Sequence, residues 1–168
     1  AIDAGLNRAI VKSCRRDRSK RLEIRVICRV CCTVHRAIKS LTNPGQQLEP
    51  SLRVVVLGIN PSLASAVAND MPDRDVNLAQ ELLALARPGD ALLGLSTSGN
   101  ARNVAYAAQT ARALGLTVVA LTGESGGRLA GLADIVIRAP ARRTDRVQEL
   151  HVQCYHALCE MLETKFFE

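Results

Sequence analysis

The sequence predicts an α/β fold in which a parallel sheet is flanked by helices. Between residues 52 and 140, short apolar runs rich in β-branched residues alternate with stretches of helical periodicity, an order typical of a parallel sheet. The chain has 168 residues, of which 48% are hydrophobic, and this suits one domain with a sizeable core. Because aromatic residues make up only 2%, we expect that core to consist of Leu, Val, Ile and Ala.

Four apolar runs are predicted to form buried strands, at residues 52–59, 91–96, 117–122 and 134–139. Apolar residues at helical spacing predict helices over residues 76–87 and 101–114, a short helical turn at 127–133 and a long helix from 145 to about 165. Gly115 suits the position just after the end of the second helix. Asp145 suits the N-cap of the last one.

The first 50 residues differ in charge from the rest of the chain. They hold 11 Lys and Arg against 4 Asp and Glu, a net charge of +7, whereas the remaining residues sum to −1. We expect a basic segment of two helices over 1–50, including a helix-like stretch at 24–38, followed by a second unit over 51–168. A basic run can hold a phosphate backbone, but no aromatic residue interleaves with it, so nucleic acid is disfavoured as a partner.

The cysteines and the hydropathy bear on metal binding and on compartment. Cys28, Cys31, Cys32 and His35 have ligand-like spacing but lack the second cysteine pair of a zinc ribbon, and cysteine in a helical stretch packs as a small apolar residue. No signal peptide and no apolar run of about 18 residues are recognised. We therefore expect no membrane segment and a reducing, cytoplasmic location.

An anion site is predicted where the strand at 91–96 runs into the helix at 101–114. Free N–H groups and the dipole at a helix start favour negative charge, and the hydroxyls of Ser96, Thr97 and Ser98 add donors. Gly99 allows a close backbone approach. From the residues alone, a plain N-cap remains an equal alternative.

Three motifs carry a resemblance to a known family. The stretches GLSTSGN (94–100), LTGESGG (121–127) and DRVQELH (145–151) resemble the sugar isomerase (SIS) fold, in particular its phosphoheptose isomerase branch. The resemblance covers residues 52–168, about 70% of the chain. It implies a flavodoxin-like three-layer sandwich and the conversion of sedoheptulose 7-phosphate into an aldose heptose phosphate.

The resemblance also implies roles for individual residues. It assigns phosphate binding to Ser96, Thr97 and Ser98, places Asn69, Asp70 and Asp145 near the sugar, makes Gln148 and His156 ligands of a zinc ion and makes His156 the catalytic base. Such a reaction needs a base that moves a proton between C2 and C1, which histidine suits near neutral pH, and an electrophile such as zinc. Gln148 and His156 are eight residues apart, about 12 Å along a helix. We interpret His151, beside the apolar stripe, as structural.

The first 50 residues depart from the family pattern. The Gly-Asn-Gly-Gly-Ser loop and the helix with a His and a Glu four residues apart, both expected there, are absent. Two of the usual zinc ligands are therefore missing. Residues 5–50 are either a divergent insert or the product of an altered reading frame.

Two classes of function follow from this resemblance. The first is a sugar-phosphate isomerase that acts as a homo-oligomer, a dimer or a tetramer. The alternative is a non-catalytic SIS module that binds a sugar phosphate or a protein partner such as a replication-initiation factor. Turnover of a ketose phosphate would favour the first class, and binding without turnover the second.

Overall fold

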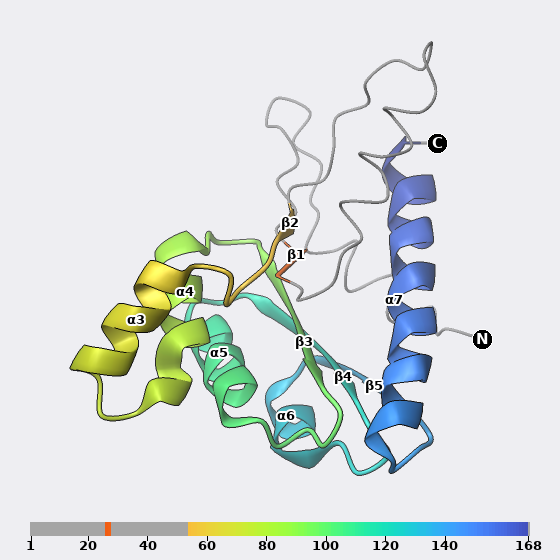
Figure 1. Ribbon diagram of the computed structural model, residues 1–168. Helices are drawn as coiled ribbons and strands as arrows, with labels where there is room; N and C mark the ends of the chain where they lie inside the picture. The colour runs from red at the N-terminus through yellow and green to blue at the C-terminus, as the bar shows by residue number, and fades with distance from the viewer. Residues whose placement is uncertain (1–25, 28–53, 168) are drawn as a thin grey trace.

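The computed structural model describes residues 26–27 and 54–167, which form a parallel sheet with helices on both faces (Figure 1). This confirms the predicted fold class. The described part contains five strands in the order β2-β1-β3-β4-β5. They are β1 (Val26–Ile27), β2 (Val54–Val55), β3 (Ala91–Ser96), β4 (Thr117–Thr122) and β5 (Ile135–Arg138).

The helices divide between the two faces of the sheet. Figure 1 shows the smaller helices grouped together and the long α7 standing alone across the sheet from them. The helical elements are α3 (Pro61–Asp70), the 3₁₀ turn η1 (Arg74–Val76), α4 (Asn77–Leu85), α5 (Arg102–Ala113), α6 (Gly127–Leu132) and α7 (Thr144–Phe167). None of the helices in the described ranges is long and apolar enough to cross a membrane.

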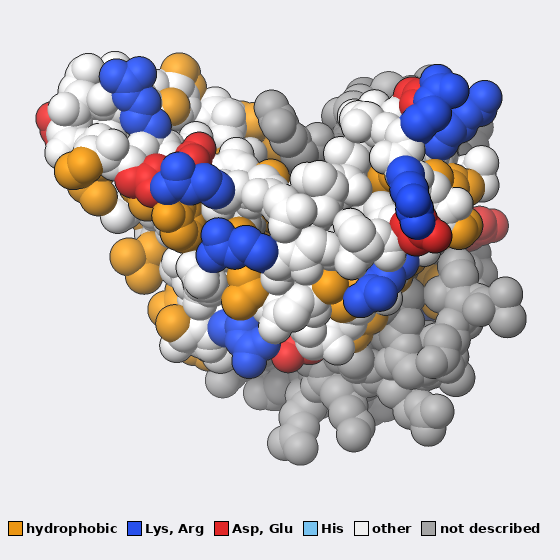
Figure 2. Space-filling model, turned by 90° about the horizontal axis from the view of Figure 1, so that it is seen from below, with side chains coloured by type: hydrophobic (Ala, Val, Ile, Leu, Met, Phe, Trp, Pro, Cys, Tyr) orange, Lys and Arg blue, Asp and Glu red, His pale blue; other side chains and the backbone are white. Residues whose placement is uncertain are grey.

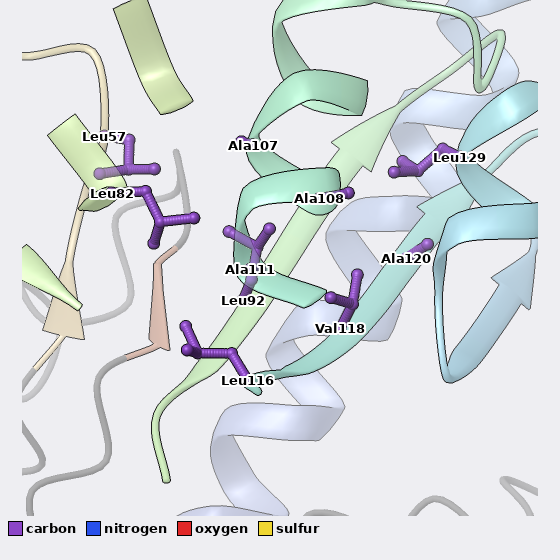
Figure 3. Packing of buried hydrophobic residues seen from close by; sticks show 10 residues of the cluster. All are labelled: Leu57, Leu82, Leu92, Ala107, Ala108, Ala111, Leu116, Val118, Ala120 and Leu129. Atoms are coloured by element: carbon purple, nitrogen blue, oxygen red, sulfur yellow. The ribbon is translucent and has the colours of Figure 1, made fainter. Parts of the chain in front are cut away.

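Each face of the sheet has its own apolar core. Successive residues of a strand point to opposite faces, so Val118 and Ala120 of β4 join the cluster under α4, α5 and α6 (Figure 3). Val119 and Leu121 join the cluster under α7, which also includes Leu158. The residues that α5 contributes are Ala107, Ala108 and Ala111, whose small side chains allow that helix to lie close to the sheet.

The strand order has a direct consequence for ligand binding. The chain passes from β1 to β2 on one side and then crosses to β3 on the other side of β1. In open parallel sheets, ligands bind outside the carboxyl ends of the strands at such a switch point. We therefore expect a ligand site at the carboxyl end of β3.

The first predicted strand and the helix after it differ from expectation. Strand β2 ends at Val55, not at residue 59, because the chain turns at Leu57 and Gly58, whose φ is +85°. Helix α3 was not predicted. Asn60 caps it by accepting a 3.1 Å hydrogen bond from the N–H of Leu63, and Pro61 occupies its first turn, as helix starts favour.

Two further predictions are wrong. Val26 and Ile27, expected within a helix, form β1, because β-branched residues favour extended backbone and both neighbouring strands pair with them. Asp145 is not the N-cap of α7, which already begins at Thr144; it lies in the first turn. The rest of segment 1–50, with the cysteine cluster and the boundary at residue 50, lies outside the described residues.

The other elements lie where they were predicted. Strands β3 and β4 match residue for residue, and β5, α4, α5 and α6 match within about two residues at either end. Gly115 follows α5 with a φ of +73°, as predicted for the residue that ends this helix.

We predict that the core substitution Leu121→Ala lowers the free energy of unfolding by about 2–5 kcal/mol, since it leaves a cavity at a fully buried position. Urea denaturation followed by circular dichroism measures the loss. Leu83→Ala on α4 is the matched control, because Leu83 is 55% exposed, and it should change stability by less than about 0.5 kcal/mol. Equal losses in the two variants would contradict this description of the core.

Candidate active site at the carboxyl end of β3

A cavity of about 430 Å³ extends along β3 to its carboxyl end and is also lined by residues of α5 and α7. Its polar wall on the sheet side is Ser96 and Thr97. The polar residues that line it from the helices are Asn103 of α5 and, at about one-turn spacing on α7, Gln148, His151 and Tyr155. The cavity thus lies at the switch point of the sheet and brings the strand end, a helix start and the last helix together.

The turn at residues 96–100, here called the serine turn, is closed by its own hydrogen bonds. The N–H of Gly99 donates to the Ser96 carbonyl at 3.1 Å. The Asn100 N–H donates to the Ser98 hydroxyl at 3.1 Å, and the Asn100 side-chain amide donates to the Ser98 carbonyl at 3.2 Å. Ser96 is buried and Thr97 half-buried, while Ser98 is exposed and does not line the cavity.

The serine turn packs directly on residues 123–127, here called the glycine loop. The Gly123 N–H donates to the Thr97 carbonyl at 3.0 Å. A Cβ atom on Gly99 would lie 2.0 Å from the Gly126 carbonyl oxygen, and one on Gly127 would lie 2.5 Å from the Ser98 oxygen. The backbones meet so closely that only glycine fits at these positions. The Gly126-Gly127 pair in the sequence indicates a close backbone contact at these residues, but it does not indicate that the serine turn is the segment they contact.

The serine turn also caps α6. The side-chain oxygen of Asn100 accepts from the Arg128 N–H at 3.0 Å, and the Gly99 carbonyl accepts from the Leu129 N–H at 2.9 Å. The N–H groups of Arg128 and Leu129 in the first turn of α6 are therefore already hydrogen-bonded to the serine turn. At the start of α5, by contrast, the N–H groups of Ala101, Arg102 and Asn103 have no acceptor within the described part of the chain. Unpaired N–H groups at a helix start are the kind of donors that bind anions.

A charged cluster that the sequence did not reveal holds the start of α5. The Arg102 guanidinium contacts Asp73 and lies 3.4 Å from an Asp75 oxygen, and the Tyr106 hydroxyl donates to Asp73 at 3.0 Å. The pKa of Asp73 lies below its ordinary value, chiefly because the Asp75 N–H donates to it, with Tyr106 and Arg102 adding to the effect. The single positive charge of Arg102 is thus already offset by the carboxylates of Asp73 and Asp75.

The structure does not bring every predicted residue to the cavity. Asn69 and Asp70 are exposed at the end of α3 and do not line it. Asp145 is exposed and pairs with Arg143 at 2.8 Å. His156 is exposed two turns beyond Gln148, outside the cavity lining, and its ring contacts the Tyr155 ring edge-on with centroids 5.0 Å apart. Of the α7 residues in the prediction, Gln148 alone reaches the cavity.

The described residues do not fit a zinc ion by themselves. Catalytic zinc sites normally use three protein ligands, whereas the resemblance assigns two residues on α7, Gln148 and His156. In the residues that the structure describes, no group of three His, Cys, Asp or Glu could hold a metal. We therefore assign no step of a reaction to zinc.

We predict that Gly99→Ala destabilises the protein more than Gly115→Ala does. Both glycines have similar left-handed φ values, +69° and +73°, but a Cβ at Gly115 meets nothing within 4 Å. The control should lose about 1–2 kcal/mol from the backbone conformation alone, and Gly99→Ala roughly 3 kcal/mol or more because of the added clash. Equal losses in chemical denaturation would show that the serine turn can move away from the glycine loop.

Comparison with known proteins agrees with this geometry. The SIS domain family matches residues 46–123. A phosphoheptose isomerase of Mycobacterium tuberculosis is 51% identical over 118 residues, which are 70% of this chain and 60% of that protein. The structure resembles a phosphoheptose isomerase from Neisseria gonorrhoeae, with 32% identity and a TM-score of 0.66 over 82% of this chain and 75% of that one. It also resembles one from Francisella tularensis, with 28% identity and a TM-score of 0.69 over 84% of this chain and 76% of that one.

The chain spans about 60% of the length of the mycobacterial relatives that it matches. The mycobacterial relative is 51% identical over 70% of this chain, and the solved structures share the arrangement of sheet and helices. On these grounds the chain belongs to the SIS-domain family, in its phosphoheptose isomerase branch.

Proposed function

We propose that this chain binds a sugar phosphate at the serine turn and isomerises it between ketose and aldose forms, as a phosphoheptose isomerase does. One observation carries the proposal. Three backbone N–H groups at the start of α5 have no acceptor in the described residues, and they lie beside the Ser96 and Thr97 hydroxyls at the switch point of the sheet. Uncompensated donors that converge at a helix start are the features that bind phosphate.

The phosphate would be held mainly by groups of the backbone. The α5 dipole favours negative charge at that helix start, and the contact with the glycine loop fixes where the donors lie. The sugar would extend from this point into the cavity, towards the α7 wall at Gln148.

The proton transfer would run through an enediol. A base takes a proton from C1 of the ketose, the electron pair of that C–H bond forms the C1–C2 double bond, and the C2 oxygen takes up the negative charge. Returning a proton to C2, with transfer of the O1 proton to O2, gives the aldose. We assign the base to His156 on the resemblance and because imidazole is the commonest general base; its side chain lies outside the described cavity.

Completion of this site would need groups beyond the described residues. A zinc ion at Gln148 and His156, which the resemblance implies, would need further ligands from elsewhere. We propose that the chain acts as a homo-oligomer, a dimer or a tetramer, in the cytoplasm, and that a second copy supplies part of the site.

A second candidate function is sugar-phosphate binding without turnover. The observation in its favour is that the anion site is formed entirely from described residues, whereas the described metal donors are too few. An assay on sedoheptulose 7-phosphate at several protein concentrations separates the two functions, because oligomer-dependent sites gain activity as the concentration rises. Binding without turnover at every concentration would favour the second function.

We predict that the double change Ser96→Ala, Thr97→Val weakens binding of sedoheptulose 7-phosphate by roughly 2 kcal/mol, at about 1 kcal/mol for each lost hydrogen bond, because these two hydroxyls line the cavity. This corresponds to an affinity loss of roughly 30-fold, measured by calorimetry. Ser65→Ala is the control, since Ser65 is exposed on α3, and should leave the affinity unchanged. If the double variant binds as tightly as the native chain, the side-chain hydroxyls of the serine turn do not hold the phosphate.

If the native chain turns over the ketose phosphate, His156→Gln should lower the turnover number by about 100-fold or more. The affinity for the sugar phosphate should change by less than about threefold, because the imidazole and the serine turn act on different parts of the substrate. Clear turnover that survives this substitution would exclude His156 as the base.

A further inference from the structure

We propose that His151 is a positioning residue that fixes α7 against the end of β4 and so sets the distance between the α7 wall of the cavity and the serine turn. The effect on ligand binding rests on the proposed function, whereas the contact between His151 and Thr122 is independent of that function.

The environment of His151 differs from that of a histidine that merely fills space. Its side chain is 4% exposed, and its Nε2 atom lies 3.0 Å from the Thr122 carbonyl oxygen. A carbonyl oxygen only accepts hydrogen bonds. The Nε2 atom must therefore carry the proton and donate it, which fixes the orientation of the ring.

Thr122 is the point where the elements around the site meet. Its side chain is fully buried, and its carbonyl also accepts from the Ala139 N–H at 2.8 Å, just beyond β5. In the sheet, Thr122 is paired with Ser96 of β3. The next residue, Gly123, donates to the Thr97 carbonyl in the serine turn at 3.0 Å. The imidazole is therefore two hydrogen bonds and one residue away from the serine turn.

The hydrogen bond between His151 and Thr122 fixes the orientation of α7, which its apolar contacts do not fix. Leu158 and Cys154 pack on Val119 and Leu121, but apolar contact is non-directional and tolerates rotation or sliding of a helix. A hydrogen bond is directional. Gln148 and Tyr155 are three residues before and four after His151, on the same helix face, and all three line the cavity. Fixing His151 therefore fixes the face that meets the ligand.

We test this role with two substitutions at one position. His151→Leu keeps the bulk and removes the donor, whereas His151→Gln keeps an N–H donor on a chain of similar reach. We expect the affinity for sedoheptulose 7-phosphate to fall about tenfold in the Leu variant and to stay within about threefold of the native value in the Gln variant. Gln153→Leu, at an exposed position on the same helix, should bind as the native chain does. Equal affinities of the Leu variant and the native chain, or equal losses in Leu and Gln, would overturn the proposal.

A spectroscopic readout keeps this test separate from the proposed function and from misfolding of a variant. Long-range ¹H–¹⁵N spectra of the native chain should show a proton on Nε2 of His151, because the carbonyl partner requires one. An imidazole whose Nε2 lacks the proton would overturn the proposal, even if the chain binds no sugar phosphate. If the native chain shows the Nε2 proton but binds no sugar phosphate, the proposed function fails while the contact stands.

Discussion

The main-chain contact between the serine turn and the glycine loop determines where the candidate site lies. Gly99 and Gly126 approach so closely that a Cβ at Gly99 would meet the Gly126 oxygen at 2.0 Å. The same contact lets the turn cap α6 through Asn100 and Gly99. The start of α6 is satisfied in this way, whereas the N–H groups of Ala101, Arg102 and Asn103 at the start of α5 have no acceptor among the residues that the structure describes.

The sheet supplies the rest of the site. Its strand order places the switch point beside β3, and the helices on its two faces, α5 and α7, supply opposite walls of the cavity. Figure 2 views the molecule from below, where the strands end, and shows Lys and Arg side chains spread over this face with acidic side chains beside several of them. Within the described ranges, Arg102, Arg142, Arg143 and Arg146 form ion pairs with acidic side chains.

The sequence predicted the elements whose local pattern is strong. Strands β3 and β4 are buried, near-continuous apolar runs, as parallel strands are, and their bounds were predicted without error. Helix α3 was missed because it has one buried residue, Val67, and its signal is the Asn60-Pro61 start. The serine turn was predicted from its residue types. The Asp73–Arg102 cluster and the His151–Thr122 bond each join residues 29 apart in the chain, and no local pattern reports such contacts.

A titration of the ¹⁵N-labelled chain with sedoheptulose 7-phosphate tests the central claim most directly, because it reads each backbone donor separately. The account predicts that the amide signals of Ala101, Arg102 and Asn103 shift most, with inorganic phosphate moving the same three signals. Signals of Gly123, Glu124 and Gly126 in the glycine loop should shift less, since their N–H groups already donate to carbonyl oxygens within the protein. Saturable binding that leaves these three amides unmoved and shifts signals elsewhere would contradict the account.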